Sequence, residues 1–225
     1  MVILVCSCDK NEDLFEPFHH CIEKYWKNHP EIVYTTETII NPYYKTLCKN
    51  YLLEKWTKRI RETLKEIPDN EILLMIDDIF IRKPVDTKRI EYARANLKDN
   101  IACFNFEKVF NQNDLESGLN GWKIRQKGSE YELSLMCGLW NKQKLIDILS
   151  EDSDPWSVEY KQNTKGYDYY INSGDYIIDW GYKTFNPVGV VKGKWAREVV
   201  DFFKKEGIDI DYEKRGFIDN NTNIQ

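Results

Sequence analysis

The chain has 225 residues and a net charge of -5, with 42% hydrophobic and 31% charged residues. This composition is typical of a globular protein and excludes intrinsic disorder. A chain of this length can bury a substantial core, and we expect one domain over 1–218 and a frayed polar tail over 219–225. Because the sequence has no long basic block, it predicts no nucleic acid among the partners.

The cysteines and the apolar runs bear on the cell compartment. The six cysteines follow no metal-binding spacing, and most lie in apolar segments, where a reduced Cys behaves as a small hydrophobe. The first residues lack the basic start and the length of a signal peptide, and no apolar run reaches about 18 residues. We therefore expect a cytoplasmic protein with no transmembrane segment, whose contact with a membrane would be peripheral.

Strands and helices are predicted to alternate through the first half of the chain. Short apolar runs predict the strands, and apolar residues at helical spacing predict the helices. The opening β-α-β order favours a parallel sheet with a right-handed crossover. The strands are expected at 2–8, 32–36, 72–76 and 101–106, and the helices from residue 14, over 52–67, and from 86 or 87 to 97.

The second half is predicted to be richer in loops. A β-hairpin is expected over 121–136, around the turn at Lys127 and Gly128. Asp154 followed by Pro155 is typical of a helix start, with Asp as N-cap and Pro in the first turn. The remaining expected elements are a helix over 142–149, irregular structure or short strands over 167–178, an edge strand over 185–191 and a helix over 196–206. Together the pattern predicts an α/β fold with a mixed sheet flanked by helices.

Two carboxylates, Asp77 and Asp78, directly follow the most apolar run of the chain, Ile72 to Ile76. Ligands of open α/β sheets bind outside the carboxyl ends of strands. Adjacent side chains on an extended chain point to opposite faces, so a turn would be needed to bring both to one ligand. Such oxygen ligands suit Mg²⁺ or Mn²⁺. The alternative is that the pair only ends the strand in a polar turn.

Three segments, taken together in order, resemble nucleotide-sugar glycosyltransferases of the GT-A type. They are Asp77-Asp78, in the place of the DxD motif; 134–140, with the sequence SLMCGLW; and 155–159, with the sequence PWSVE, which looks like a P-W-x-x-E segment. The chain is similar over nearly its whole length to small single-domain members encoded by bacterial surface-polysaccharide clusters and some large DNA viruses. It departs from the DxD motif in one respect, because Ile79 stands where the motif has its last Asp.

The resemblance implies a GT-A-like (Rossmann-like) sheet and a hexosyltransferase type of glycosyltransferase, acting in polysaccharide biosynthesis. The donor would be a UDP-, GDP- or dTDP-sugar, and Asp77 and Asp78 would hold Mn²⁺ or Mg²⁺ against its diphosphate. Asp9, in the loop after the first strand, would contact the base or the ribose.

Three basic residues are candidates for phosphate contacts in such an enzyme: Arg59, Lys192 and Lys194. For each of them the alternative is a solvated basic surface.

The acceptor would be a glycan or a glycolipid. Glu159 would act as general base on the acceptor hydroxyl, which implies inversion, and Asp154 is the second candidate. Each of these carboxylates also has a structural explanation, since negative charge near a helix N-terminus is stabilising and Asp is a preferred N-cap. Trp140 and Trp156 would stack on sugar, or pack in the core.

Three other functions remain open. A carbohydrate-binding or catalytically idle protein with this fold would account for the seven Trp and fourteen Tyr residues. A nucleotidyltransferase also uses paired carboxylates, but the segment after the first strand, Asp9-Lys10-Asn11-Glu12, has no glycine for a phosphate loop. A glycoside hydrolase needs only two carboxylates, although adjacent acids at a buried strand end suit a metal better.

Overall fold

The computed structural model describes residues 1–98, 100–108, 113–161, 163–181 and 189–218. The chain forms two compact units. Unit 1 consists of Met1–Asp9, Pro30–Ile76 and Asp86–Ile177, and unit 2 of Lys10–His29, Asp77–Val85 and Ile178–Gln225. The single catalytic domain over 1–218 stays a prediction, and the tail predicted over 219–225 lies outside the described residues.

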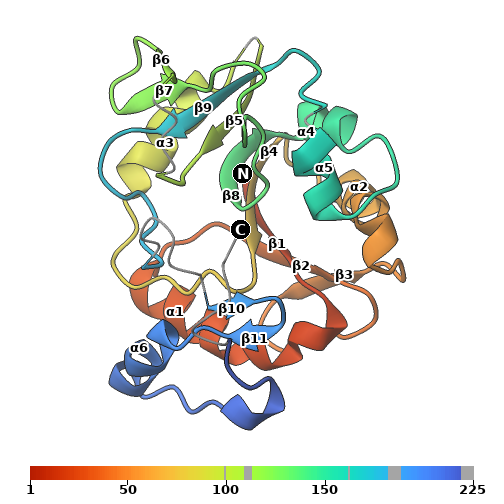
Figure 1. Cartoon of the computed structure of the whole chain (residues 1–225), viewed down its shortest axis with the longest axis vertical. Helices are drawn as coiled ribbons and strands as arrows, with labels where there is room; N and C mark the ends of the chain where they lie inside the picture. The colour runs from red at the N-terminus through yellow and green to blue at the C-terminus, as the bar shows by residue number, and fades with distance from the viewer. Residues whose placement is uncertain (99, 109–112, 162, 182–188, 219–225) are drawn as a thin grey trace. The chain divides into compact units, whose positions relative to one another are not determined.

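Unit 1 is built on a nine-stranded mixed sheet (Figure 1). In sheet order the strands are β3 (Lys45–Cys48), β2 (Ile32–Thr36), β1 (Val2–Cys6), β4 (Glu71–Ile76), β8 (Cys137–Asn141), β5 (Ile101–Asn105), β9 (Asp168–Asn172), β7 (Trp122–Ile124) and β6 (Leu115–Glu116). The first four are parallel, and β8 runs antiparallel to both β4 and β5. The predicted mixed sheet and the four predicted strands of the first half are therefore confirmed.

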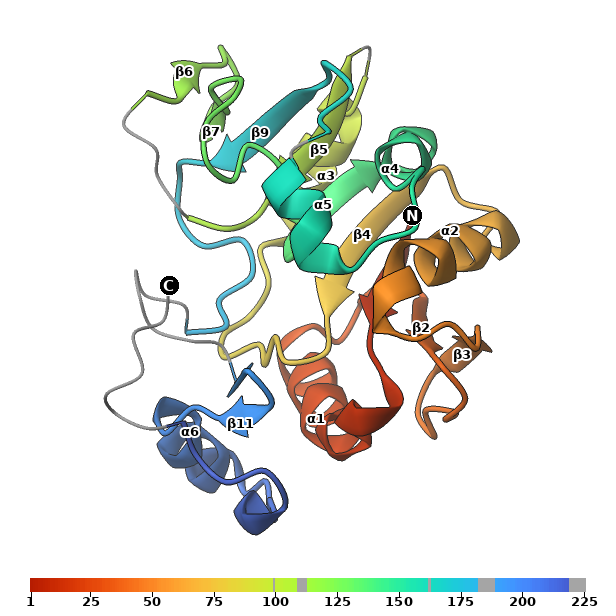
Figure 2. The same cartoon turned by 45° about the vertical axis from the view of Figure 1, so that its right-hand side comes forward.

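The helices of unit 1 in the described residues are α2 (Trp56–Glu66), α3 (Thr87–Asn96), α4 (Lys142–Ile148) and α5 (Pro155–Lys161). Of these, α2, α4 and α5 pack on one face of the sheet (Figure 2). One buried hydrophobic cluster joins the sheet to α2, α4 and α5, and it includes Leu4, Leu74, Ile60, Leu145 and Val158. The side chains of Leu4 and Leu74 meet because β1 and β4 pair in register, with Leu4 opposite Leu74.

Two predicted helix starts are confirmed by their caps. The Asp86 side chain accepts a hydrogen bond from the Arg89 N–H at 3.1 Å, and α3 begins at the next residue. The Asp154 side chain likewise accepts a bond from the Ser157 N–H at 2.9 Å, ahead of α5. In both cases the carboxylate satisfies a donor that the first turn of a helix leaves unpaired.

The hairpin predicted over 121–136 is wrong. The turn itself is present, since the Ser129 N–H donates to the Gln126 carbonyl at 3.1 Å. However, β7 pairs with β6 on one side and with β9 on the other, so the residues that follow the turn have no free strand edge to join. The strand β9 itself comes from the Tyr-rich segment for which irregular structure or short strands were expected.

Unit 2 contains α1 (Phe15–Tyr25), α6 (Glu198–Glu206) and a two-stranded antiparallel sheet of β10 (Val190–Val191) and β11 (Lys194–Trp195). Phe80 packs against Phe203 of α6, with ring centroids 4.8 Å apart, and against Trp195 of β11. Most of the edge strand predicted over 185–191 lies outside the described residues. No helix in the described part of the chain combines the length and the apolar character needed to cross a bilayer.

The residue before β10 must be glycine. The Gly189 N–H donates to the Asp78 carbonyl at 3.3 Å, which brings the backbone against the segment that follows β4. A Cβ atom at Gly189 would lie 2.0 Å from a carbon of the Phe80 ring. This close approach attaches the β10–β11 hairpin to the acidic pair.

We expect Gly189→Ala to destabilise the protein by about 1–3 kcal/mol or more, because the ring of Phe80 must move out of a packed core. Gly193→Ala is the matched control: a Cβ there meets no neighbour within 4 Å, so only the left-handed backbone, with φ of +78°, costs free energy. Urea unfolding of both variants measures the difference. Equal destabilisation would contradict the packing argument.

Candidate functional site

The acidic pair of unit 2 lies in a turn directly after β4, and both side chains are buried. One oxygen of Asp77 accepts a hydrogen bond from the Asn11 side-chain amide at 3.1 Å. The Oδ1 atom of Asp78 is buried and has no hydrogen-bond partner among the described residues. A buried oxygen without a partner is unfavourable, which makes this atom a candidate position for a ligand.

The electrostatics of the pair favour a cation. Burial, and to a lesser extent the charge of Asp77, raise the pKa of Asp78 to about 7, whereas the N–H of Val190 and the charge of Arg215 act in the opposite direction. A divalent ion would relieve both the desolvation and the repulsion, so the residues present fit such an ion. No group of three or more His, Cys, Asp or Glu side chains in the described residues could hold a metal. Two carboxylates would therefore leave the remaining positions to water and phosphate oxygens, as is usual for Mg²⁺.

Arg215 supports this pair from the far end of the chain. Its guanidinium donates to the Asn11 side-chain oxygen at 3.0 Å and to Asp13 at 2.7 Å, and Asn11 in turn donates to Asp77. The contact joins residues 204 positions apart, so no local pattern in the sequence could have indicated it. The network fixes the orientation of Asp77.

Lys192 and Lys194 lie on the β10–β11 hairpin, and both are exposed. The N–H of Val190 in the same hairpin donates to the Asp78 side chain. Lys192 and Gly193 form its turn, with φ of 50° and 78°. The hairpin that carries the two predicted phosphate ligands is thus anchored to the acidic pair.

Asp9 lies in unit 1, where its carboxylate braces the loop after β2. One oxygen accepts from the N–H groups of Thr38 at 2.9 Å and Ile39 at 3.0 Å, and the other accepts from the Thr38 hydroxyl at 2.6 Å. Burial alone would raise the pKa of Asp9, but these hydrogen bonds outweigh it and lower the pKa. Asp9 therefore holds the loop at the carboxyl ends of β1 and β2 in place.

Two residues predicted to contact ligands, Arg59 and Trp140, are buried. Arg59 of α2 is 1% exposed, forms an ion pair with Glu37 and donates to the Ser7 carbonyl at 2.8 Å, so its guanidinium is not available to a phosphate. Trp140 is completely buried in the central strand β8, where it packs edge to face against Tyr169. Both residues therefore support the structure from within, and for Trp140 the burial favours the alternative that it packs in the core.

A second pair of carboxyl groups, Glu107 and Glu159, meets in unit 1. Glu159 lies on α5, and its Oε1 accepts a bond from the Leu135 N–H at 2.7 Å. The hydroxyl of Ser134 is hydrogen-bonded to the carboxyl groups of both Glu107 and Glu159. The ladder between β5 and β8 explains the meeting, since the Phe106 N–H donates to the Cys137 carbonyl at 2.9 Å and so brings the residue after β5 to the segment before β8.

Both carboxyl groups of this pair have raised pKa values. Burial, and to a lesser extent the charge of Glu159, raise the pKa of Glu107 to about 7. Burial also raises the pKa of Glu159. Because a hydroxyl has a single proton to donate, Ser134 can serve only one ionised carboxylate at a time. Near neutral pH the Glu107 carboxyl group is therefore partly protonated.

Glu107 was missed by the sequence reasoning, although a signal was present. It directly follows the predicted strand over 101–106, as Asp77 directly follows the strand over 72–76. An acidic residue at the carboxyl end of a buried strand could have been marked at both places by the same rule.

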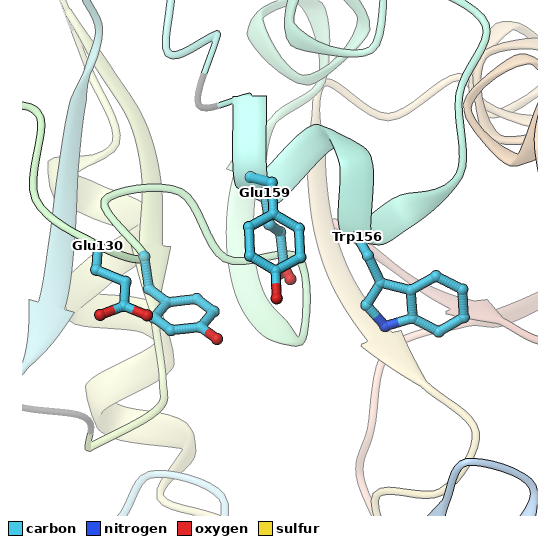
Figure 3. A pocket seen from close by; sticks show the side chains of 5 residues that line it. Glu130, Trp156 and Glu159 are labelled. Carbon is cyan, nitrogen blue, oxygen red and sulfur yellow. The ribbon is translucent and has the colours of Figure 1, made fainter. Parts of the chain in front are cut away.

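Glu159 also lines a pocket at the surface of unit 1, together with Glu130, Tyr131, Trp156 and Tyr160. Figure 3 shows the Glu159 side chain between those of Glu130 and Trp156 in this view. Trp156 is 57% exposed, in contrast to Trp140. The predicted base Glu159 and the predicted sugar contact Trp156 thus lie in one pocket.

Asp154, the second candidate base, is engaged by its own helix. Its two oxygens accept from the N–H and the hydroxyl of Ser157, at 2.9 and 2.6 Å. These bonds lower the pKa of Asp154. A lowered pKa weakens a general base at neutral pH, so the capping role accounts for this residue.

No known protein family matches the sequence, and no curated protein matches it either. The structure is similar to TarS of S. aureus, with a TM-score of 0.52 and 13% identity over 83% of this chain and 37% of TarS. It is also similar to the glycosyltransferase GlyE of Streptococcus pneumoniae, with a TM-score of 0.47 and 12% identity over 75% of this chain and 44% of GlyE. A third similar structure is 2-C-methyl-D-erythritol 4-phosphate cytidylyltransferase of Thermus thermophilus, with a TM-score of 0.48 and 11% identity over 83% of this chain and 93% of that enzyme. The chain spans less than half the length of TarS and of GlyE.

At this level of identity the similarity concerns the fold. A mixed sheet with parallel β2, β1 and β4, an antiparallel β8 and flanking helices is the GT-A-like architecture, as the resemblance of the sequence implied.

Glu107→Gln tests the raised pKa of Glu107 through stability. In the folded protein Glu107 keeps its proton up to about pH 7, whereas the ordinary value for an unfolded Glu is 4.5. Between these values the folded state binds more protons than the unfolded state, so the wild type loses stability as pH rises. The free energy of unfolding of the variant, relative to the wild type, should therefore increase by roughly 1–3 kcal/mol from about pH 5 to about pH 8.

Urea unfolding at several pH values measures this difference. Glu54→Gln, at an exposed position of unit 1, is the control and should show no such trend. A difference between Glu107→Gln and the wild type that does not change with pH would show that Glu107 is ionised throughout.

Proposed function

We propose that this chain is a glycosyltransferase of the hexosyltransferase type, which moves a sugar from a nucleotide-diphosphate donor to a hydroxyl group of a glycan or glycolipid acceptor, assisted by Mn²⁺ or Mg²⁺. The observation that carries the proposal is the buried acidic pair after β4 of a GT-A-like sheet, with the unpartnered oxygen of Asp78. The six free cysteines agree with a reducing, cytoplasmic location.

In this proposal the diphosphate of the donor binds to unit 2. Asp77 and Asp78 would hold the metal ion, and Asn11 and Arg215 orient Asp77 for this task. The ion would supply positive charge against the diphosphate as it leaves. Lys192 and Lys194, which are exposed on the hairpin that is anchored at Asp78, would contact the phosphates directly.

The nucleoside of the donor belongs to the loop that Asp9 braces. The Asp9 carboxylate is fully engaged by Thr38 and Ile39, so we assign it to shaping this loop rather than to a direct contact with the base or the ribose.

Glu159 is the general base in this mechanism. It takes the proton of the acceptor hydroxyl as that oxygen bonds to the anomeric carbon, and the bond from this carbon to the diphosphate breaks with its electron pair on the leaving group. Attack from the side opposite the leaving group inverts the anomeric centre.

Donor hydrolysis tests the proposal without knowledge of the acceptor. We expect one of a panel of UDP-, GDP- and dTDP-sugars to release nucleoside diphosphate slowly in the presence of Mn²⁺ or Mg²⁺, and the release to stop when the metal is chelated. Asp78→Asn should abolish both the release and any metal-dependent thermal stabilisation by nucleotide.

Misfolding is controlled in the same experiment. Asp78→Asn removes one of two buried like charges at nearly constant shape, so without metal the variant should unfold at the wild-type temperature or above it. Release that continues in chelator would contradict the metal assignment. No release and no stabilisation by any nucleotide would favour the carbohydrate-binding or catalytically idle protein.

Glu159→Gln tests the base. We expect kcat for transfer to fall by about 10² to 10⁴-fold, since the amide cannot accept the proton, while the fold is retained. Asp154→Asn is the matched control at the second candidate, and it should cost at most about 1 kcal/mol of stability through a weaker cap. Steady-state kinetics of both variants decide between them, because a larger loss of kcat in Asp154→Asn would reverse the assignment.

A further inference from the structure

Three aromatic rings surround the Glu159 pocket, and all of them are unusually exposed. Tyr131 is 42% exposed, Trp156 57% and Tyr160 76%. Single exposed rings are common on protein surfaces, but several around one pocket mark a binding site. Tyr131 in addition has a φ of 55°, a backbone conformation that is rare for a bulky residue and is often found at functional sites.

Helix α5 presents two of these rings and the base on one face. Trp156, Glu159 and Tyr160 are three and four residues apart, a spacing that places side chains side by side on a helix. Val158 points the other way and belongs to the hydrophobic core. The rings are therefore presented by an element that is anchored to the sheet.

We infer that this pocket binds a neutral sugar unit of the acceptor glycan, stacked on Trp156, Tyr131 and Tyr160, and that Glu130 and Glu159 exclude acidic sugars from it. The inference rests on the proposed function and adds the class of acceptor. A pyranose ring has an apolar face of C–H groups, which suits an aromatic ring, and an edge of hydroxyl groups, which suits carboxylate acceptors.

The charge of the pocket determines the choice among sugars. Ionised Glu130 and Glu159 can only accept hydrogen bonds, and hydroxyl groups of a neutral sugar can donate them. None of the described residues that line the pocket is Lys or Arg. A uronic or sialic acid would bring a carboxylate against like charge with no cation to pair with, which disfavours it.

The exposure of the rings argues against a cationic ligand. Aromatic rings bind ammonium groups most strongly when they enclose and desolvate them. Here the most exposed ring, that of Tyr160, is three-quarters open to solvent. An open platform of this kind is suited to the flat face of a sugar.

Binding to a glycan array tests the inference on the whole chain. The probes are oligosaccharides of neutral hexose and N-acetylhexosamine units, together with matched ones that carry uronic or sialic acid. We expect binding to at least one neutral glycan, weakened about tenfold or more in Trp156→Ala and in Tyr160→Ala. Tyr92→Ala, at an exposed ring of α3 outside the pocket, should bind as the wild type does.

Glu130→Gln tests the exclusion of acidic sugars. It should improve binding of the acidic counterpart of the preferred glycan severalfold and leave binding of the neutral one within about twofold. Each of four results would overturn the inference. They are equal binding of acidic and neutral glycans by the wild type, unchanged binding by Trp156→Ala, displacement of the glycan by choline, and no binding of any neutral glycan.

The two proposals can fail separately. Donor hydrolysis with no binding of neutral glycans would leave the transferase in place and refute the acceptor pocket. Glycan binding that depends on Trp156, with neither donor hydrolysis nor stabilisation by any nucleotide, would support the pocket and refute the transferase.

Discussion

The end of β4 is the point on which the candidate donor site depends, because there a buried apolar strand passes into two buried carboxylates. Two adjacent negative charges in a buried turn are costly unless they are paired. Asn11, Arg215 and the N–H of Val190 satisfy part of this demand, but Oδ1 of Asp78 is left without a partner in the described structure. Such groups are often found where a bound ligand supplies the missing partner. The unpartnered Oδ1 atom of Asp78 is therefore better evidence for a ligand site than the Asp77-Asp78 sequence alone.

The two units solve the same electrostatic problem in different ways. Glu107 and Glu159 also lie close together, but the fold brings them together from distant segments, and burial raises the pKa of both. Asp77 and Asp78 are neighbours in sequence, and an external cation is the natural partner for them. Glu159 also lines the surface pocket, whereas Glu107 is buried, so Glu159 is the member of the pair that a ligand could reach.

Local signals predicted the elements, and tertiary contacts decided the site. Apolar runs placed β1, β2, β4 and β5, and the caps Asp86 and Asp154 placed two helix starts, since each signal acts over a few residues. The contact of Arg215 with Asn11 and the meeting of Glu107 with Glu159 join distant segments, which no spacing rule reaches. The hairpin prediction failed for the same reason: its turn is local and present, but the partner of β7 was determined by competition among strands.

Trp140 and Trp156 lie in the two segments, 134–140 and 155–159, that resemble those of GT-A glycosyltransferases, but their environments differ. Trp140 stands in the middle of β8, between β4 and β5, so both neighbours bury it. Trp156 is in the first turn of α5, where Val158 takes the core side of the helix and leaves Trp156 on the open side. Both positions belong to segments that a motif would label as functional, yet only the helix position can reach a ligand. Because the same short helix carries Glu159, the proposed base and the proposed platform for the acceptor are held on one element, and a sugar stacked on Trp156 would lie in the same pocket as Glu159.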